Sequence, residues 1–253
     1  GNKFEDEVCE YLEKKYPGYV KEIVKDVRTD LTPESQNITW QYMSEGVPII
    51  TQAPLYNWSN KTFGVADLVV RSDWINKIID TPTLSADEVY LKAPNLSGNY
   101  HYIVIDIKWT TMMLCSDGIR IRNSQRFPAY KGQLAIYNAA IGQLQGYTPP
   151  KAYILAKSWK CTSCNVTYDG YNCFDLLGHI DFTEFDENYL DLTKKAVDWV
   201  RNVRYNGAKW SCNPPSRNEL YPNMCNRYDN PYHMVKKDLA KKNHEITEIW
   251  MVG

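Results

Sequence analysis

The sequence predicts an α/β fold with a central mixed sheet of about four or five strands, flanked by helices. Three observations favour this class: an amphipathic helix opens the chain, two strongly apolar strand-like runs follow it, and a second helix leads directly into a further strand. With 253 residues, of which 43% are hydrophobic and 23% charged, the chain can fill one large core or two small ones. This composition excludes a disordered chain and a small disulfide-held scaffold.

The helices and strands are expected in a definite order along the chain. Residues 3–16 place apolar side chains on one helical face, and Pro17-Gly18 ends that pattern. Residues 63–71 and 100–109 are the strongest strands, and the Pro- and Gly-containing stretch 72–101 between them predicts an insertion. The other expected elements are short strands at 20–30, 47–53 and 88–91, a helix at 132–144, a strand at 151–157, a hairpin-like region at 161–181, and helices at 187–205 and 232–242.

Charge and cysteine content limit the kind of partner and compartment. The 29 Lys and Arg residues nearly balance the 30 Asp and Glu residues, so any contact with nucleic acid must come from a local basic patch. Seven cysteines are an odd number, which favours a reducing, cytoplasmic or nuclear compartment. No apolar run approaches the length of a membrane span, so no membrane association is expected. Five Asn-x-Ser/Thr triplets, at Asn37, Asn57, Asn60, Asn95 and Asn165, favour a secreted, glycosylated binding protein as an alternative.

The ends of the chain predict a piece of a longer protein. The sequence starts at Gly1 without a Met and stops in the apolar stretch 246–253. Further domains of a parent protein are therefore expected as partners.

The most informative feature is a set of charged residues on two apolar strands. Asp106 and Lys108 are two residues apart in a strand, so they project to the same face, and Asp67 in the preceding strand can meet them from the side. Two neighbouring carboxylates repel each other unless a cation lies between them, and Mg²⁺ or Mn²⁺ suits such oxygen ligands. A lysine beside that cation can act on a water aimed at a phosphate.

At these residues the chain resembles the PD-(D/E)xK nuclease superfamily, and within it the RecB-like branch, which includes nuclease domains of recombination helicases and CRISPR-associated adaptation nucleases. Four segments match in order, with Ala66 standing where the family has its Pro: Gly1-Asn2-Lys3-Phe4-Glu5, Gly64-Val65-Ala66-Asp67, Asp106-Ile107-Lys108, and the QxxxY motif Gln133-Leu134-Ala135-Ile136-Tyr137. The interval between Asp67 and Asp106 exceeds the family's usual one. Asp73 and Asp80 therefore remain alternatives for the first acid.

The resemblance implies a restriction-endonuclease-like core over residues 1–157, with the insertion at 72–101, and a C-terminal α+β extension over 158–253 packed on that core. It implies that Glu5, Asp67 and Asp106 hold the metal together with the Ile107 carbonyl. Lys108 would then act on the attacking water. Gln133 and Tyr137 would position the DNA backbone.

Two further groups of residues are candidates for binding. Arg120, Arg122, Arg126 and Lys131 lie with Phe127 and Tyr130 between the strand acids and the QxxxY helix, where they could contact phosphates and unpaired bases; a solvated loop is the alternative. Cys161, Cys164 and Cys173, with Cys9 ahead of them, could form a cysteine cluster for iron–sulfur or Zn²⁺, with Cys212 and Cys225 as a competing Zn²⁺ pair. Free thiols are the expected state.

Together these features predict a Mg²⁺- or Mn²⁺-dependent deoxyribonuclease that acts on single-stranded DNA or DNA ends, as an exonuclease or flap-type enzyme, in repair, recombination or replication. The alternative is a non-catalytic nucleic-acid-binding or scaffolding module that keeps the nuclease fold. The intact acids Glu5, Asp67 and Asp106 favour the enzyme, because clustered carboxylates are unfavourable unless they are used.

Overall fold

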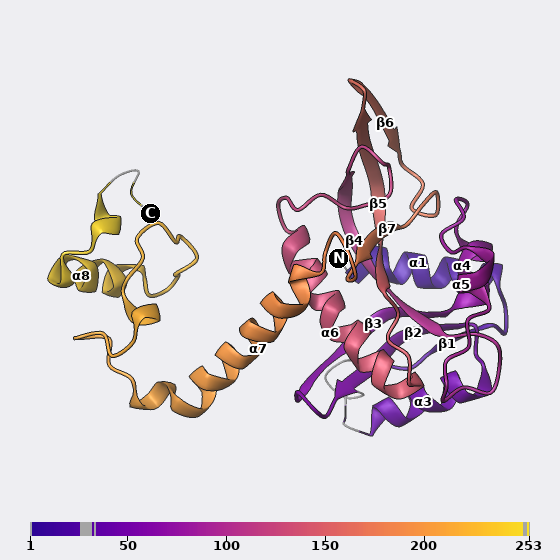
Figure 1. The fold of residues 1–253 in the computed structure, drawn as a ribbon, viewed down its shortest axis with the longest axis horizontal. Coiled ribbons are helices and arrows are strands. Elements are labelled where there is room, and N and C mark those ends of the chain that lie inside the picture. Colours follow the sequence, from indigo (N-terminus) through magenta and orange to yellow (C-terminus); the bar gives the residue numbers. More distant parts are fainter. Residues whose placement is uncertain (1, 26–31, 33, 250–251, 253) are drawn as a thin grey trace. The chain divides into compact units, whose positions relative to one another are not determined.

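The computed structural model describes residues 2–25, 32, 34–249 and 252 (Figure 1). Within these residues the chain divides into two compact units, Gly1–Lys195 and Ala196–Gly253. The candidate site residues belong to the first unit, apart from the exposed Cys212 and Cys225, and that unit is described first.

The first unit is built on a mixed, open sheet of seven strands. The strands are β1 (Val20–Glu22), β2 (Ile49–Asn57), β3 (Thr62–Arg71), β4 (Tyr102–Leu114), β5 (Lys151–Ser163), β6 (Val166–Gly170) and β7 (Gly178–Asp181). Their order is β1-β2-β3-β4-β5-β6, and β7 also pairs with β5. The β1–β2 and β4–β5 pairs are parallel, and the others are antiparallel.

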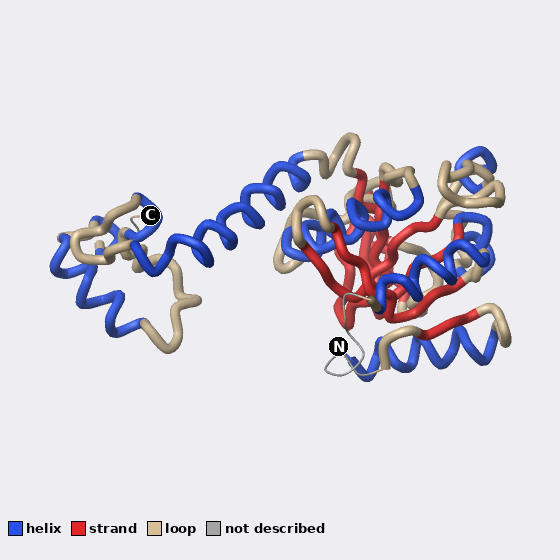
Figure 2. The backbone as a smooth tube through the Cα atoms, turned by 90° about the horizontal axis from the view of Figure 1, so that it is seen from below, coloured by secondary structure: helices blue, strands red, loops and turns tan. Residues whose placement is uncertain are grey.

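Helices cover both faces of this sheet (Figure 2). The helices of this unit are α1 (Asn2–Lys15), α3 (Ser35–Glu45), α4 (Ser72–Ile78), α5 (Ala86–Val89), α6 (Phe127–Gln145) and the start of α7 (Asn188–Asn206). α6 packs across β2, β3, β4 and β5 and fills one core with Leu134, Tyr137 and Ile141. On the other face, Val8 and Leu12 of α1 and Ile75 of α4 fill a second core. The apolar faces of α1 and α6 thus hold the sheet between them.

The α/β class and the strongest elements agree with the sequence prediction, and three details differ. The sheet has seven strands because β6 and β7 extend it beyond the expected four or five. α3 was not predicted, since Ser35, Gln36 and Thr39 on its buried side give no apolar period. The strand expected at 88–91 is instead the short helix α5, which begins with a capping box between Ser85 and Glu88.

The boundary expected at residue 157 lies inside a continuous strand. β5 runs on to Ser163, and β6 and β7 pair with it, so the first compact unit extends to Lys195. Hydrogen bonding along β5 ties residues on either side of the expected boundary to the same sheet.

The second unit contains the end of α7, α8 (His233–Asn243) and three 3₁₀ turns, at Gly207–Lys209, Asn218–Leu220 and Ile246–Glu248. Trp199 stacks on Trp210 with ring centroids 5.5 Å apart, and the Arg217 guanidinium lies 4.8 Å from the Trp210 ring. Among all described helices of the chain, none is both long and apolar enough to cross a membrane.

Candidate active site

The site lies where β3 and β4 separate. The two strands pair only from Leu68 opposite Ile105 to Arg71 opposite Tyr102. Asp67 and Asp106 are the next residues of the two strands, and from there β3 stays paired with β2 while β4 stays paired with β5. The Ile107 N–H donates to Asp67 Oδ2 over 2.6 Å, so a side-chain carboxylate accepts this hydrogen bond from the β4 backbone in place of a carbonyl of β3. The divergence of the strands therefore places both carboxylates side by side.

Asp106 is buried in an electrostatically unusual way. Lys108 Nζ lies 2.7 Å from Asp106 Oδ2, and the Asp106 side chain is 1% exposed. Neither carboxylate oxygen of Asp106 accepts a hydrogen bond of good geometry from any residue that the structure describes. Burying a carboxylate is costly unless its lost hydration is replaced. Among the described residues, the Lys108 ammonium is the positive charge that compensates the Asp106 carboxylate.

The pKa values show how strongly these groups interact. Burial, and next the neighbouring Asp106, raise the pKa of Asp67 well above its ordinary range. Burial also raises the pKa of Asp106, although Lys108 opposes the shift. Burial lowers the pKa of Lys108, but the carboxylates of Asp106, Asp67 and Glu5 raise it by more, so the lysine stays charged. A small cation would relieve the strain that both acids share.

Glu5 belongs to the same electrostatic group. It lies in the first turn of α1 and is partly buried. Burial raises the pKa of Glu5, Lys108 lowers it, and Asp106 raises it again. Glu5 also raises the pKa of Asp67, so the three acids influence one another across α1, β3 and β4. The structure thus places Asp67, Asp106 and Lys108 together, with Glu5 within electrostatic reach of them.

Of the residues that are described, no three His, Cys, Asp or Glu side chains meet in a geometry that could hold a metal ion. Asp67 and Asp106 form a pair of neighbouring carboxylates, with Glu5 in electrostatic reach of Asp67. The undonated oxygens of Asp106 and the all-carboxylate donor set fit a hard cation such as Mg²⁺ or Mn²⁺.

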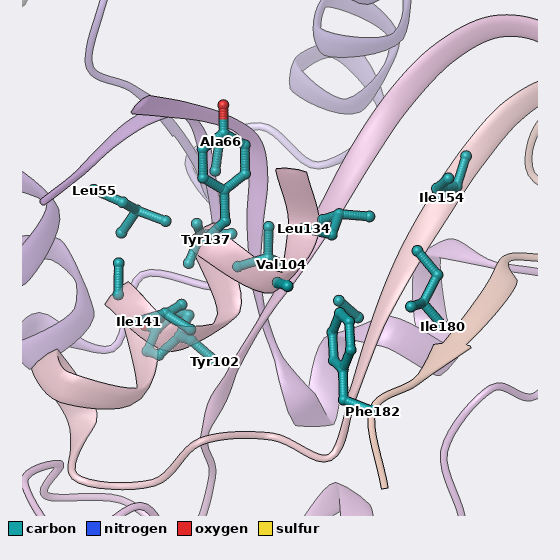
Figure 3. Packing of buried hydrophobic residues seen from close by; sticks show 14 of the residues in the cluster. Leu55, Ala66, Tyr102, Val104, Leu134, Tyr137, Ile141, Ile154, Ile180 and Phe182 are labelled. Atoms are coloured by element: carbon teal, nitrogen blue, oxygen red, sulfur yellow. The ribbon is translucent and has the colours of Figure 1, made fainter. Parts of the chain in front are cut away.

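The QxxxY residues form one hydrogen-bonded pair on α6. Gln133 Nε2 donates to the Tyr137 hydroxyl over 3.0 Å, and Tyr137 belongs to the same buried cluster as Ala66 (Figure 3). A Cβ at Gly64 would come within 2.5 Å of Tyr137 Cε1, so only glycine fits there without a shift. Asp106 and Asp67 both act on the pKa of Tyr137, which burial raises. The motif therefore lies beside the strand acids.

The basic residues expected to bind DNA divide into different environments. Lys131 is fully buried, and its Nζ donates to Asp186 Oδ1 at 2.6 Å, to Asn123 Oδ1 at 2.7 Å and to the Ile121 carbonyl at 2.8 Å. It cannot reach a phosphate, so its predicted binding role is wrong. The sequence suggested a loop here, whereas α6 begins at Phe127 and turns Lys131 into the interior.

The three arginines of this region are exposed. Arg120 pairs with Asp117, and Arg122 Nε donates to the Leu114 carbonyl over 2.9 Å. Arg126 precedes α6 and lines a cavity of about 220 Å³ together with Trp109 and Tyr130. Tyr130 connects this cavity to the site, because Lys108 Nζ lies 5.0 Å from the centre of the Tyr130 ring. Among the three arginines, Arg126 is therefore the one that shares a cavity with a residue in contact with Lys108.

The cysteines predicted as a cluster are free thiols. Cys161 is buried and donates to the Cys115 carbonyl over 3.1 Å, whereas Cys164 is exposed and Cys173 is half-buried.

The two alternatives for the first acid, Asp73 and Asp80, have other partners. Asp73 makes a two-point ion pair with Arg71, at 2.7 and 2.8 Å, and Asp80 is exposed near Asn172. Asp67 is therefore the acid that lies beside Asp106.

Two aromatic features near the site were missed by sequence reasoning. Trp109, directly after Lys108, is 58% exposed and contacts Phe4. On the β2–β3 hairpin, Tyr56 is stacked between Trp58 and Phe63. Trp109, Tyr56 and Phe63 lie in strands, where an aromatic residue normally indicates core. The signal available in the sequence was that Tyr56, Trp58 and Phe63 flank the polar turn sequence Ser59-Asn60-Lys61.

The chain matches no protein-family model, and a search of curated proteins returns no match to it. Its function must therefore be argued from the site.

Proposed function

We propose that this chain is a Mg²⁺- or Mn²⁺-dependent deoxyribonuclease of the PD-(D/E)xK superfamily, with the restriction-endonuclease-like fold and the QxxxY motif of the RecB-like branch. The single observation that carries the proposal is the meeting of Asp67, Asp106 and Lys108 where β3 and β4 diverge. Two buried acids and a lysine at a strand divergence are costly to stability, and phosphodiester hydrolysis is a reaction that uses all three.

In this proposal the acidic residues bind the cation, and the lysine contacts the water or the phosphate. Asp67 and Asp106, with Glu5 and the Ile107 carbonyl, would hold the cation, which when bound supplies positive charge to the phosphate and an acidified water. Lys108 stays protonated, so it donates hydrogen bonds to the attacking water or to a phosphate oxygen. Gln133 and Tyr137 orient the phosphodiester backbone beside it. Hydrolysis joins the water oxygen to phosphorus and breaks the P–O3′ bond. The O3′ takes up a proton, leaving a 3′-hydroxyl and a 5′-phosphate.

The substrate in this proposal is single-stranded DNA or a frayed DNA end. The chain as a whole is nearly neutral, so binding depends on the local cations Lys108 and Arg126 and on exposed aromatics.

Cleavage of end-labelled DNA tests the proposal. Single-stranded and duplex DNA, labelled at the 5′ or the 3′ end, is incubated with Mg²⁺, Mn²⁺ or EDTA. The wild type is expected to cut only with the metal, and Asp106→Ala is expected to abolish cutting. Asp80→Asn is the matched control, because it removes an exposed carboxylate that lies away from Asp106. Binding without cutting under every metal condition contradicts the proposal and favours a non-catalytic binding module.

A further inference from the structure

Trp109 owes its exposure to an irregularity in β4. Lys108 pairs with Ala156 and Thr111 pairs with Ser158, so Trp109 and Thr110 together lie opposite the single residue Lys157. Such a bulge redirects the side chains of its strand, and bulges are common beside active sites. The bulge begins at the residue after Lys108. A change in the direction of the chain therefore presents a large aromatic ring next to the candidate active site.

Trp109 is also the boundary between three hollows in the surface. It lines the cavity of about 220 Å³ that it shares with Arg126 and Tyr130. It also lines a cavity of about 420 Å³ with Phe4, Lys157 and Tyr171, and a third of about 310 Å³ with Phe4. A ring that borders every one of these hollows is reachable from several directions.

Trp109 has an aromatic neighbour, Phe4, and a positively charged neighbour, Lys157. The Phe4 ring packs against Trp109, with centroids 5.1 Å apart at 60°. Lys157 Nζ lies 4.3 Å from the Trp109 ring centre. Glu7 is the one acid that lines these hollows, and its carboxylate lies 3.7 Å from Lys3 Nζ. A cation–π contact at an exposed site is weak, so Lys157 can leave the ring for a phosphate at little cost.

From this arrangement we propose that Trp109 is a stacking platform for one unpaired base of a single-stranded nucleic acid, whose adjacent phosphate is bound by Lys157. This proposal rests on the proposed nuclease function, because it assigns the hollow beside Lys108 to the same substrate strand. Nucleic acid is the occupant that the chemistry favours, since it alternates flat apolar rings with anionic groups. A base within a duplex is already stacked on both faces, so the platform selects single strands. Trp109 is a binding residue here, and it does not touch the reacting atoms.

The test is a thermodynamic cycle that removes the Trp109 side chain, the base, or both, and compares the losses in binding. Binding of single-stranded oligonucleotides, each with an abasic site at one position, is measured by fluorescence anisotropy in Ca²⁺ and again in EDTA. For the wild type, one abasic position is expected to weaken binding about 5- to 150-fold, the usual range for one stacked base. Trp109→Ala is expected to show the same loss with the intact oligonucleotide and no further loss at that abasic position.

Three variants make the result specific. Trp109→Phe keeps a ring and is expected to bind within about threefold of the wild type. Tyr90→Ala removes an exposed aromatic side chain directly after α5 and is expected to leave binding unchanged. Lys157→Ala is expected to weaken binding and to reduce its dependence on salt. Circular dichroism of each variant shows whether it is folded.

The outcomes separate this inference from the nuclease proposal. The platform is contradicted if folded Trp109→Ala binds single-stranded DNA like the wild type. It is also contradicted if the loss in affinity from Trp109→Ala multiplies with the loss from the abasic site, and both results hold even where DNA is cleaved. If the cycle shows coupling but no metal supports cleavage, the platform stands as part of a binding module, and the nuclease proposal fails.

Discussion

Asp67 illustrates a conflict between stability and function within a single residue. Its carboxylate is buried beside Asp106, yet its Oδ2 is already used by the Ile107 N–H. An asparagine in its place keeps an acceptor for that N–H and loses the charge. We expect Asp67→Asn to raise the free energy of unfolding at neutral pH by about 1 kcal/mol, as measured by urea denaturation.

The same substitution is expected to remove activity. Cleavage of single-stranded DNA in Mg²⁺ should fall by about 100-fold or more. Asp73→Asn serves as the comparison, since it breaks the ion pair with Arg71 and should lower stability without affecting cleavage. A less stable Asp67→Asn with full activity would mean that Asp67 is a structural residue.

Gly64 shows how a residue without a side chain contributes to the site. An alanine Cβ would meet Tyr137 Cε1 at 2.5 Å and its hydroxyl oxygen at 2.8 Å. Gly64→Ala should therefore displace Tyr137 and lower the cleavage rate by about 10- to 100-fold, as a shift of about 1 Å in an active site does. Gly207→Ala is the control, because its Cβ meets only Val203 at an ordinary 3.5 Å. Equal rates for Gly64→Ala and the wild type would exclude a role for Tyr137's position.

The acids and the lysine could be selected from the sequence because charges within apolar strands are rare and therefore informative. Asp106 and Lys108 interrupt the end of an apolar run, and the structure shows them in contact. Trp109 could not be selected in this way. Its exposure depends on the bulge opposite Lys157, and strand register between distant segments is not encoded in local pattern.

At the scale of elements, the start of α6 gives Arg126 and Lys131 different environments, although both appear in the sequence as basic residues of one segment. Lys131 lies within the helix and pairs with buried Asp186, whereas Arg126 precedes the helix in an open cavity. Lys131→Ala should lower the free energy of unfolding by about 3–5 kcal/mol, because it leaves a buried carboxylate without its partner. Arg126→Ala should leave stability unchanged and weaken oligonucleotide binding. The opposite pattern, from thermal unfolding and anisotropy, would show that Lys131 does reach the substrate.

The pairing of β7 with β5 introduces a pH-dependent term into stability. His179 of β7 packs its ring against Tyr153 of β5 at 4.9 Å, and burial, with Lys151 next, lowers the pKa of His179 to about 4. In the unfolded chain a histidine titrates near pH 6.5. The unfolded state therefore binds the proton first as the pH falls, and stability is lost between about pH 6.5 and about pH 4.

Urea denaturation across this range measures the effect. The wild type should lose about 2–3 kcal/mol more than His179→Gln between about pH 7 and about pH 4.5. Parallel pH profiles for the two proteins would mean that His179 is accessible to protons in the folded state.

How well each element could be predicted depends on where its stability comes from. α1 and β3 have apolar residues at the expected spacing, and their bounds agree closely with the prediction. α3 packs with polar residues such as Thr39, whose hydroxyl donates to the Pro54 carbonyl over 2.8 Å. A helix held by such contacts leaves no apolar period in its sequence.

At the scale of the whole chain, the sequence predicted an α/β fold with a central mixed sheet flanked by helices, and the structure agrees on the class. The domain boundary was less predictable, because β6 and β7 complete the sheet from residues beyond 157. All hydrophobic residues of the two core clusters lie between Val8 and Tyr189, within the first unit. The site thus draws its support from a unit that extends to Lys195.

The central claim is that Asp106 and Lys108 act as one catalytic unit. The most direct measurement is the rate of Mg²⁺-dependent cleavage of single-stranded DNA by the wild type, Asp106→Ala, Lys108→Ala and the double variant. Each single substitution should lower the rate by about 100-fold or more, and the double variant should be no slower than the slower single, as for residues that act together. Losses that multiply, or wild-type rates in either single variant, would contradict the claim.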